Sequence, residues 1–192
     1  ILSSGIIAYG FARLDFPGKN ILFMIVLSTL MLPAYITLIP RYVIYTRLNW
    51  INTFLPLVLP SYFGGAFNIF LLRQYMMTIP RDLDDAAKID GAGFFGIYWR
   101  IILPLCRPVL GVVAVNSITF RWNDFMGPLL YLQKKDLATV SLGLRFIQGN
   151  YFGEFPVQHV MAMTFVSIVP MVLLFFFAQR YFLRGIVLTS FK

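Results

Sequence analysis

Four aspartates between residues 82 and 90 are the densest group of side chains able to bind a cation or a protein. They are Asp82, Asp84, Asp85 and Asp90. Their spacing does not match a calcium-binding loop. The dipole of a helix favours negative charge in its first turn, and Pro80 suits the start of a helix. We therefore interpret these acids as helix-capping and docking groups, and we expect no metal site.

No other group of residues in the sequence has the pattern of a catalytic site. The tripeptide Pro17-Gly18-Lys19 lacks the upstream glycine and the following hydroxyl of a phosphate-binding loop. Cys106 is the only cysteine and His159 the only histidine, so neither has a partner for nucleophilic catalysis or metal binding. We expect no catalytic residue and no cofactor on this chain, and any ATP and magnesium would be bound by a partner.

The apolar segment 106–128 carries Asn116, Arg121, Asn123 and Asp124. Arg121 and Asp124 are three residues apart, so they share a helix face and can pair. Charges inside a membrane usually face a cavity or a pathway. Two interpretations remain open: these residues line or brace the outer part of a translocation route, or the charges form a structural ion pair at a helix end.

The composition is that of a membrane protein. Of the 192 residues, 59% are hydrophobic and 12% are charged, whereas soluble domains have about 25% charged residues. The net charge of +8 comes from basic residues scattered between apolar runs, which positive-inside topology explains better than binding to nucleic acid. We expect an all-α polytopic protein in contact with lipid, in the cytoplasmic (inner) membrane of a prokaryote.

The chain is predicted to form one transmembrane domain over 1–192. The membrane segments are a partial helix at 1–14 and helices at 20–40, 54–72, 106–128 and 157–180. Between them we expect a cytoplasmic loop at 73–104, an external loop at 131–156 and a cytoplasmic tail at 181–192. The chain begins inside an apolar run with Ile1, so we expect a fragment that lacks an N-terminal helix.

Two further patterns support this arrangement. Ser4, Ala8 and Ala12 recur every fourth residue and predict a face that packs closely against another helix. The assignment places ten basic residues inside (Arg13, Lys19, Arg73, Arg81, Lys88, Arg100, Arg107, Arg180, Arg184, Lys192) and five outside (Arg41, Arg47, Lys134, Lys135, Arg145). This excess follows the positive-inside rule and puts the C-terminus in the cytoplasm.

The segment from Asp82 to Pro104 predicts a helix, a glycine hinge and a second helix. Ala86 and Ala87 are strong helix formers with small side chains, so another surface can approach them closely. Gly91 permits the left-handed backbone that ends many helices. A polar elbow of this kind between two membrane segments indicates a docking surface, although an ordinary cytoplasmic helical hairpin has the same residue types.

This segment resembles the EAA loop of ABC importer permeases. The family pattern is EAA, three residues, G, nine residues, I, one residue, LP, and it is matched at every spacing from Asp85 to Pro104. Asp85 stands where the family usually has glutamate. This substitution keeps the negative charge but shortens the reach of the side chain. The resemblance implies an ATPase-coupling helix made by Asp84, Asp85, Ala86, Ala87, Lys88, Asp90, Gly91, Ala92, Ile101, Leu103 and Pro104.

Further stretches are similar to the sugar-importing, maltose-type (MalG-like) branch of these permeases. They are FARLDFPGK, the IPRY and NTFLPLVLP region, WNDF with PLLYL, and AQRYFLRG near the C-terminus. The resemblance implies the ABC importer permease fold, of which the full family has six helices and about five are present here. It also implies contact of the external loop with a solute-binding protein, for which the candidates are Leu142, Leu144, Phe146 and Tyr151.

The implied function is transport of a carbohydrate by alternating access, driven by ATP hydrolysis on another subunit. The implied partners are a second permease subunit, an ABC ATPase dimer and an external solute-binding protein. The chain would be a transport subunit and not an enzyme. Two alternatives remain: a secondary transporter or channel, for which Asp124 is the one acid placed within a span, and a membrane scaffold.

Overall fold

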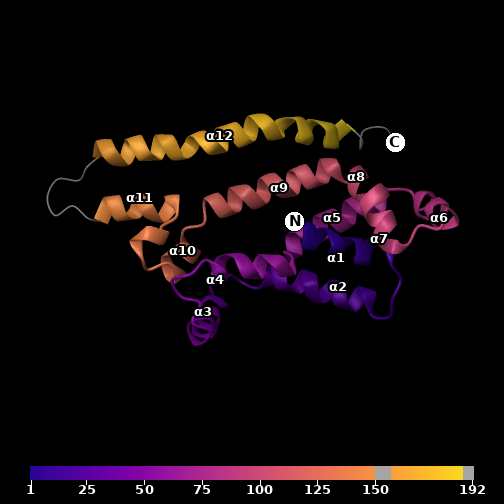
Figure 1. Ribbon diagram of the computed structural model, residues 1–192, viewed down its shortest axis with the longest axis horizontal. Coiled ribbons are helices and arrows are strands. Elements are labelled where there is room, and N and C mark those ends of the chain that lie inside the picture. Colours follow the sequence, from indigo (N-terminus) through magenta and orange to yellow (C-terminus); the bar gives the residue numbers. More distant parts are fainter. Residues whose placement is uncertain (150–156, 188–192) are drawn as a thin grey trace. The chain divides into compact units, whose positions relative to one another are not determined.

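The computed structural model describes the backbone of residues 1–149 and 157–187, and the side chains of 1–146 and 157–179. All regular elements in these ranges are helical (Figure 1). The chain divides into two compact units, each described by itself below. Unit 1 is built mainly from Ile1–Pro33 and Ser61–Ala114, and unit 2 from Ala34–Pro60 and Val115–Arg180.

Unit 1 contains the N-terminal helices and the predicted elbow. Its elements are α1 (Leu2–Arg13), α2 (Lys19–Ser28) with the 3-10 turn η1 (Thr29–Met31), most of the 3-10 turn η2 (Leu59–Phe63), α5 (Ala66–Thr78), α6 (Asp82–Ile89), α7 (Phe94–Ile97), the π-helical turn η3 (Tyr98–Ile102), α8 (Leu103–Leu105) and the first half of α9 (Arg107–Trp122).

Helix α1 packs along α5 through its small residues. Ser4, Ala8 and Ala12 are all buried, with at most 4% of each exposed, which confirms the predicted close-packing face. The hydroxyl oxygen of Ser4 accepts a hydrogen bond from the backbone N–H of Gly65, just before α5, at 3.2 Å. The neighbouring Gly64 has a φ of +83°, so glycine is favoured at this entry to α5.

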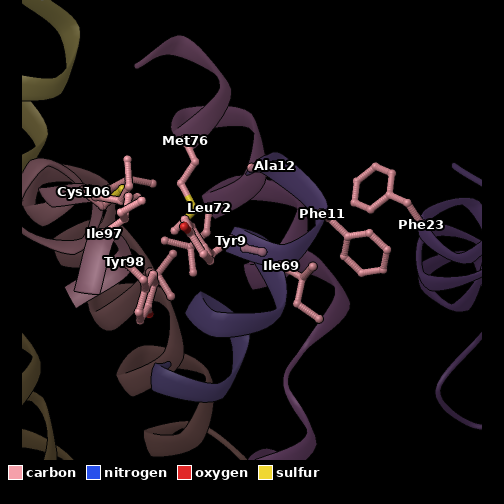
Figure 2. Packing of buried hydrophobic residues seen from close by; sticks show 14 of the residues in the cluster. Tyr9, Phe11, Ala12, Phe23, Ile69, Leu72, Met76, Ile97, Tyr98 and Cys106 are labelled. Atoms are coloured by element: carbon pink, nitrogen blue, oxygen red, sulfur yellow. The ribbon is translucent and has the colours of Figure 1, made fainter. Parts of the chain in front are cut away.

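The elbow is joined to this helix pair by an apolar cluster (Figure 2). Leu72 and Met76 of α5 are fully buried in it, as are Tyr98 and Ile102 of η3. The rings of Tyr9 and Tyr98 lie 5.1 Å apart between centroids. The segment after Gly91 is therefore part of the core of unit 1.

The helix predicted over 20–40 is shorter in the structure. Helices α2 and η1 end at Met31, and Leu32 has an extended backbone with φ −74° and ψ 119°. The ring of Pro33 disfavours helical geometry at the residue before it, which explains why the helix stops there. The next helix, α3 (Leu38–Arg47), belongs to unit 2.

Unit 2 contains α3, α4 (Leu55–Val58), the second half of α9, α10 (Met126–Tyr131), the 3-10 turn η4 (Lys135–Leu137), α11 (Val140–Gly149) and most of α12 (Val157–Val187). An aromatic contact joins α3 to α10, since the rings of Tyr45 and Tyr131 lie 5.3 Å apart between centroids. Tyr45 also stacks on Trp50, which follows α3, at 5.5 Å. The backbone N–H of Asn52 also donates to the carbonyl of Tyr131 at 2.8 Å.

Within the described residues, two helical stretches are long and apolar enough to cross a membrane. They are Leu55–Thr78 and Val157–Gln179. The pair Phe94–Leu105 and Arg107–Trp122 is a third if counted as one span, but it is bent by 78° near Cys106. The other predicted segments form shorter helices, because α1 has 12 residues and Lys19–Met31 ends before Pro33.

Gly5 gives a direct test of the packing in unit 1. A Cβ atom at this position would lie 2.6 Å from the hydroxyl of Tyr98 and 3.8 Å from the next ring atom. We therefore expect Gly5→Ala to lower the stability of the purified protein by about 1–3 kcal/mol, the usual cost of overpacking. The measurement is the thermal unfolding midpoint in detergent.

Tyr98→Phe provides the matched rescue. The buried hydroxyl of Tyr98 has no hydrogen-bond partner in the structure, so its removal alone should cost little. Combined with Gly5→Ala, it should restore most of the lost stability. Equal destabilisation by Gly5→Ala in both backgrounds would contradict this packing.

Candidate coupling site and polar cavity

Helix α6 is a short amphipathic helix with a well-defined end. Its first turn contains Asp82, Asp84 and Asp85, as the helix dipole favours. At its end Gly91 has a φ of +80°, as predicted. The N–H of Gly91 donates to the carbonyl of Lys88 at 3.0 Å, and the N–H of Ala92 donates to that of Ala87 at 2.9 Å. This pair of bonds is a Schellman motif.

The predicted coupling residues on α6 divide between two faces. Asp84 and Ala87 are buried in unit 1, whereas Asp85, Ala86 and Lys88 are exposed, as is Asp90 after the helix. The ammonium of Lys88 donates to Asp85 Oδ1 at 2.8 Å. This hydrogen bond holds the pKa of the Asp85 carboxyl below its usual range. Asp85 is therefore negatively charged at neutral pH and available to a partner surface.

Asp84 is paired with Arg13, the last residue of α1. Arg13 Nη1 lies 3.5 Å from Asp84 Oδ2, and the two side chains are only 2% and 9% exposed. Arg13 Nη2 donates to the carbonyls of Met76 and Ile79 at 2.8 Å each. Sequence reasoning treated Arg13 only as an orientation signal, because nothing in its local pattern indicates a partner so distant in the chain.

Exposed apolar side chains extend the outer surface of the elbow. Ile89 is 87% exposed, Phe94 61% and Phe95 71%. We call Asp85, Ala86 and these three residues the elbow face. An apolar surface rimmed by polar groups is typical of an interaction site. The sequence contains a signal for this surface, since the large apolar residues Ile89, Phe94 and Phe95 lie in the polar loop and not in a membrane segment.

The rest of the motif packs inward. Ile101 and Leu103 are partly buried against the core cluster, as is Ala92. Pro104 lies in α8, which continues directly from the π-helical turn η3 within the helix Phe94–Leu105. The structure thus gives the motif two roles: its second half anchors the elbow, while part of its first half is presented outward.

The second group of candidates lines a cavity within unit 2. Its volume is about 740 Å³, and the polar side chains predicted for a translocation route all contribute to it: Asn116, Arg121, Asn123 and Asp124. Tyr35, Arg41 and Tyr131 add further polar groups, and Leu57 and Leu130 are among its apolar lining. The structure therefore brings together the polar residues whose presence in an apolar segment is unexpected.

Asp124 has two partners at this cavity. Its Oδ1 accepts a hydrogen bond from the backbone N–H of Gly127 at 3.1 Å, near the start of α10. Its Oδ2 lies 3.9 Å from Arg121 Nη1, with side chains 21% and 49% exposed. Asn123 is tied by its side-chain amide to the carbonyl of Thr119 at 2.8 Å. Asp124 therefore has a structural contact and also adds charge to the cavity.

Three of the four binding-protein candidates, Leu142, Leu144 and Phe146, lie on α11. Leu142 is fully buried, and Leu144 and Phe146 are partly buried. Tyr151 lies outside the described residues. Leu142 is therefore a packing residue of unit 2, and the partly buried Leu144 and Phe146 keep some surface. Among the described residues, no group of three or more His, Cys, Asp or Glu is arranged to hold a metal ion.

The sequence matches one protein family over almost its whole length. The family is described as "Binding-protein-dependent transport system inner membrane component", and its model matches residues 1–187. The chain belongs to this family. It is therefore a membrane component of a transport system and not an enzyme, and the resemblance found in the EAA motif is confirmed at this level.

Curated relatives of the chain are also named as permease proteins. The chain is 35% identical over 192 residues to an arabinooligosaccharides transport system permease protein of Halalkalibacterium halodurans, covering 100% of the chain and 68% of the relative. It is 36% identical over 187 residues to an osmoprotective compounds uptake permease protein of Synechocystis, covering 96% and 62%. It is 32% identical over 180 residues to an sn-glycerol-3-phosphate transport system permease protein of Yersinia enterocolitica, covering 94% and 64%.

A solved structure confirms the fold. The chain matches a bacterial ABC transporter involved in the import of the acidic polysaccharide alginate, with a TM-score of 0.81 and 22% identity. The match covers 95% of this chain and 70% of that one. The predicted all-α ABC importer permease fold is therefore confirmed.

Proposed function

We propose that this chain is the permease subunit of a carbohydrate importer in the cytoplasmic membrane, with its C-terminus in the cytoplasm. Its assembly would contain a second permease, two ATPase subunits and an external solute-binding protein. The family and the names of the relatives support this proposal, since one of them transports arabinooligosaccharides. ATP and magnesium would bind to the ATPase subunits and not to this chain.

The observation that carries the proposal is the elbow face. Helix α6 is fastened on one side, through Asp84 and Ala87, and presents the charged Asp85 and the small Ala86 on the other. The exposed Ile89 adds apolar area beside them. A rigid helix with one outward face, a charge and an apolar anchor has the features of a protein-docking element. Its proposed partner is the ATPase subunit.

The proposed translocation route includes the cavity of unit 2. Its polar side chains, among them Arg41, Asn116 and Asn123, can donate and accept hydrogen bonds, as recognition of sugar hydroxyls requires. The rings of Tyr35 and Tyr131 provide flat apolar surface. Movement of α6 with the ATPase would change access to such a route, and this would be the alternating-access step.

The leading alternative is a secondary transporter or channel without an ATPase. It requires a relay of acids within the spans. Asp124, the candidate acid, is already engaged by the backbone N–H of Gly127 and by Arg121. The family assignment also favours a binding-protein-dependent system.

A bulky side chain on the elbow face should block docking. Ala86 is exposed on α6, so Ala86→Trp should fold normally but prevent close approach of another surface. We expect the amount of ATPase subunit that co-purifies with the permease to fall about tenfold, which corresponds to ~1.4 kcal/mol. Carbohydrate uptake should fall with it.

The matched control is Ala162→Trp, the same change at an exposed alanine of α12. It should leave co-purification of the ATPase unchanged. Normal co-purification with Ala86→Trp would show that α6 is not the docking element. Absence of any ATPase with the folded wild-type protein would favour the secondary-transporter alternative.

Substitutions of Asp124 separate its structural contact from its charge. Asp124→Asn keeps an oxygen for the N–H of Gly127 and should leave the thermal midpoint nearly unchanged, whereas Asp124→Ala should lose about 1 kcal/mol, the usual net value of a hydrogen bond. If the charge acts in the route, Asp124→Asn should still reduce uptake in vesicles.

Asp136→Asn serves as the control, because Asp136 is an exposed acid of η4 outside the cavity lining. Unchanged uptake with Asp124→Asn would leave Asp124 as a structural residue and remove it from the proposed route.

A further inference from the structure

One guanidinium group joins three helices of unit 1. Arg13 ends α1, and its Nη2 atom donates to the carbonyls of Met76 and Ile79 at 2.8 Å each. These carbonyls belong to the C-terminal end of α5, where positive charge is favoured, and that of Met76 also accepts the N–H of Ile79 at 3.3 Å. Arg13 Nη1 lies 3.5 Å from Asp84 Oδ2 on α6. The ends of α1 and α5 thus both meet α6 at the side chain of Arg13.

The contact is buried but incompletely satisfied. The side chains of Arg13 and Asp84 are 2% and 9% exposed, and neither Arg13 Nε nor Asp84 Oδ1 has a hydrogen-bond partner in the structure. Burying two charges costs desolvation energy that such a pair does not fully recover. A pair of this kind contributes more to the position of α6 than to the stability of the fold.

Two adjacent residues of α6 face opposite surroundings. Asp84 points into unit 1 toward Arg13, while Asp85 is exposed on the elbow face with its side chain 65% accessible. A displacement applied at the elbow face would therefore reach α1 and α5 through the side chain next to it. The only covalent link from α5 to α6 is the short segment Ile79–Arg81, and Ile79 is itself bonded to Arg13.

We propose that the Arg13–Asp84 pair is the contact that transmits movement of α6 to the membrane helices α1 and α5. Both are positioning residues, since neither is on the elbow face. The inference rests on the proposed function, because it requires an ATPase that moves α6. It adds that docking and transmission depend on different side chains, so they can be separated by mutation.

The test uses the assembled transporter in liposomes, with carbohydrate uptake and ATP hydrolysis measured in the same preparation. Asp84→Asn removes the charge and keeps the shape of the side chain. We expect the ATPase subunit to co-purify normally and to hydrolyse ATP. Uptake per ATP hydrolysed should fall about fivefold or more, within the usual range of coupling factors. Asp84→Glu keeps the charge and should retain most of this ratio.

Asp82→Asn is the control, since Asp82 is an exposed acid in the same turn of α6. It should leave the ratio unchanged. An unaltered ratio in Asp84→Asn would overturn the proposal, as would loss of the ATPase subunit from that variant, because Asp84 would then act in docking.

If the Asp84→Asn permease itself does not fold or insert into the membrane, Arg13→Lys decides the question by the same ratio. Lysine keeps the charge but not the forked geometry that reaches two carbonyls and a carboxylate together, so the ratio should fall. A wild-type ratio would overturn the proposal. Failure of the proposed function would instead be seen in the wild type, as uptake that does not depend on ATP.

Discussion

The arrangement of unit 1 depends on the buried guanidinium of Arg13. It satisfies the carbonyls of Met76 and Ile79 at the end of α5 and faces Asp84 of α6. Removing either partner would leave an uncompensated buried charge, which costs far more than the pair itself contributes. The elbow face can remain an exposed surface because the opposite side of α6 is held in this way.

The elbow also depends on two backbone features that are independent of charge. Gly91 ends α6 with a Schellman motif, and the chain then enters the core through Tyr98 and Ile102. The small residues of α1 let α5 approach closely enough for its C-terminal carbonyls to reach Arg13. Packing, backbone geometry and one ion pair therefore act on the same short helix from different sides.

Sequence reasoning predicted the features that are local in the chain. The Gly91 backbone and the buried face of Ser4, Ala8 and Ala12 follow from conformational and steric preferences within a few residues. It did not predict the partner of Asp84, because the contact with Arg13 joins residues 71 positions apart and neither local pattern encodes it. The early end of the helix before Pro33 could have been predicted from the proline alone. The cavity lining was anticipated as a set of polar residues, but Arg41 and Tyr35 join it from another segment.

If the Arg13–Asp84 pair transmits movement, α6 and α1 move as one body, and a distance measurement tests this most directly. Cys106 is the only cysteine, so Cys106→Ser leaves no native site for a spin label. Labels can then be attached to cysteines introduced at two exposed positions, Ile6 of α1 and Leu83 of α6. In the assembled transporter, pulsed electron paramagnetic resonance should give the same distance without nucleotide and with ATP bound. The distance should change with ATP when Asp84→Asn is added. A change with ATP in the otherwise wild-type protein would show that α1 does not follow α6.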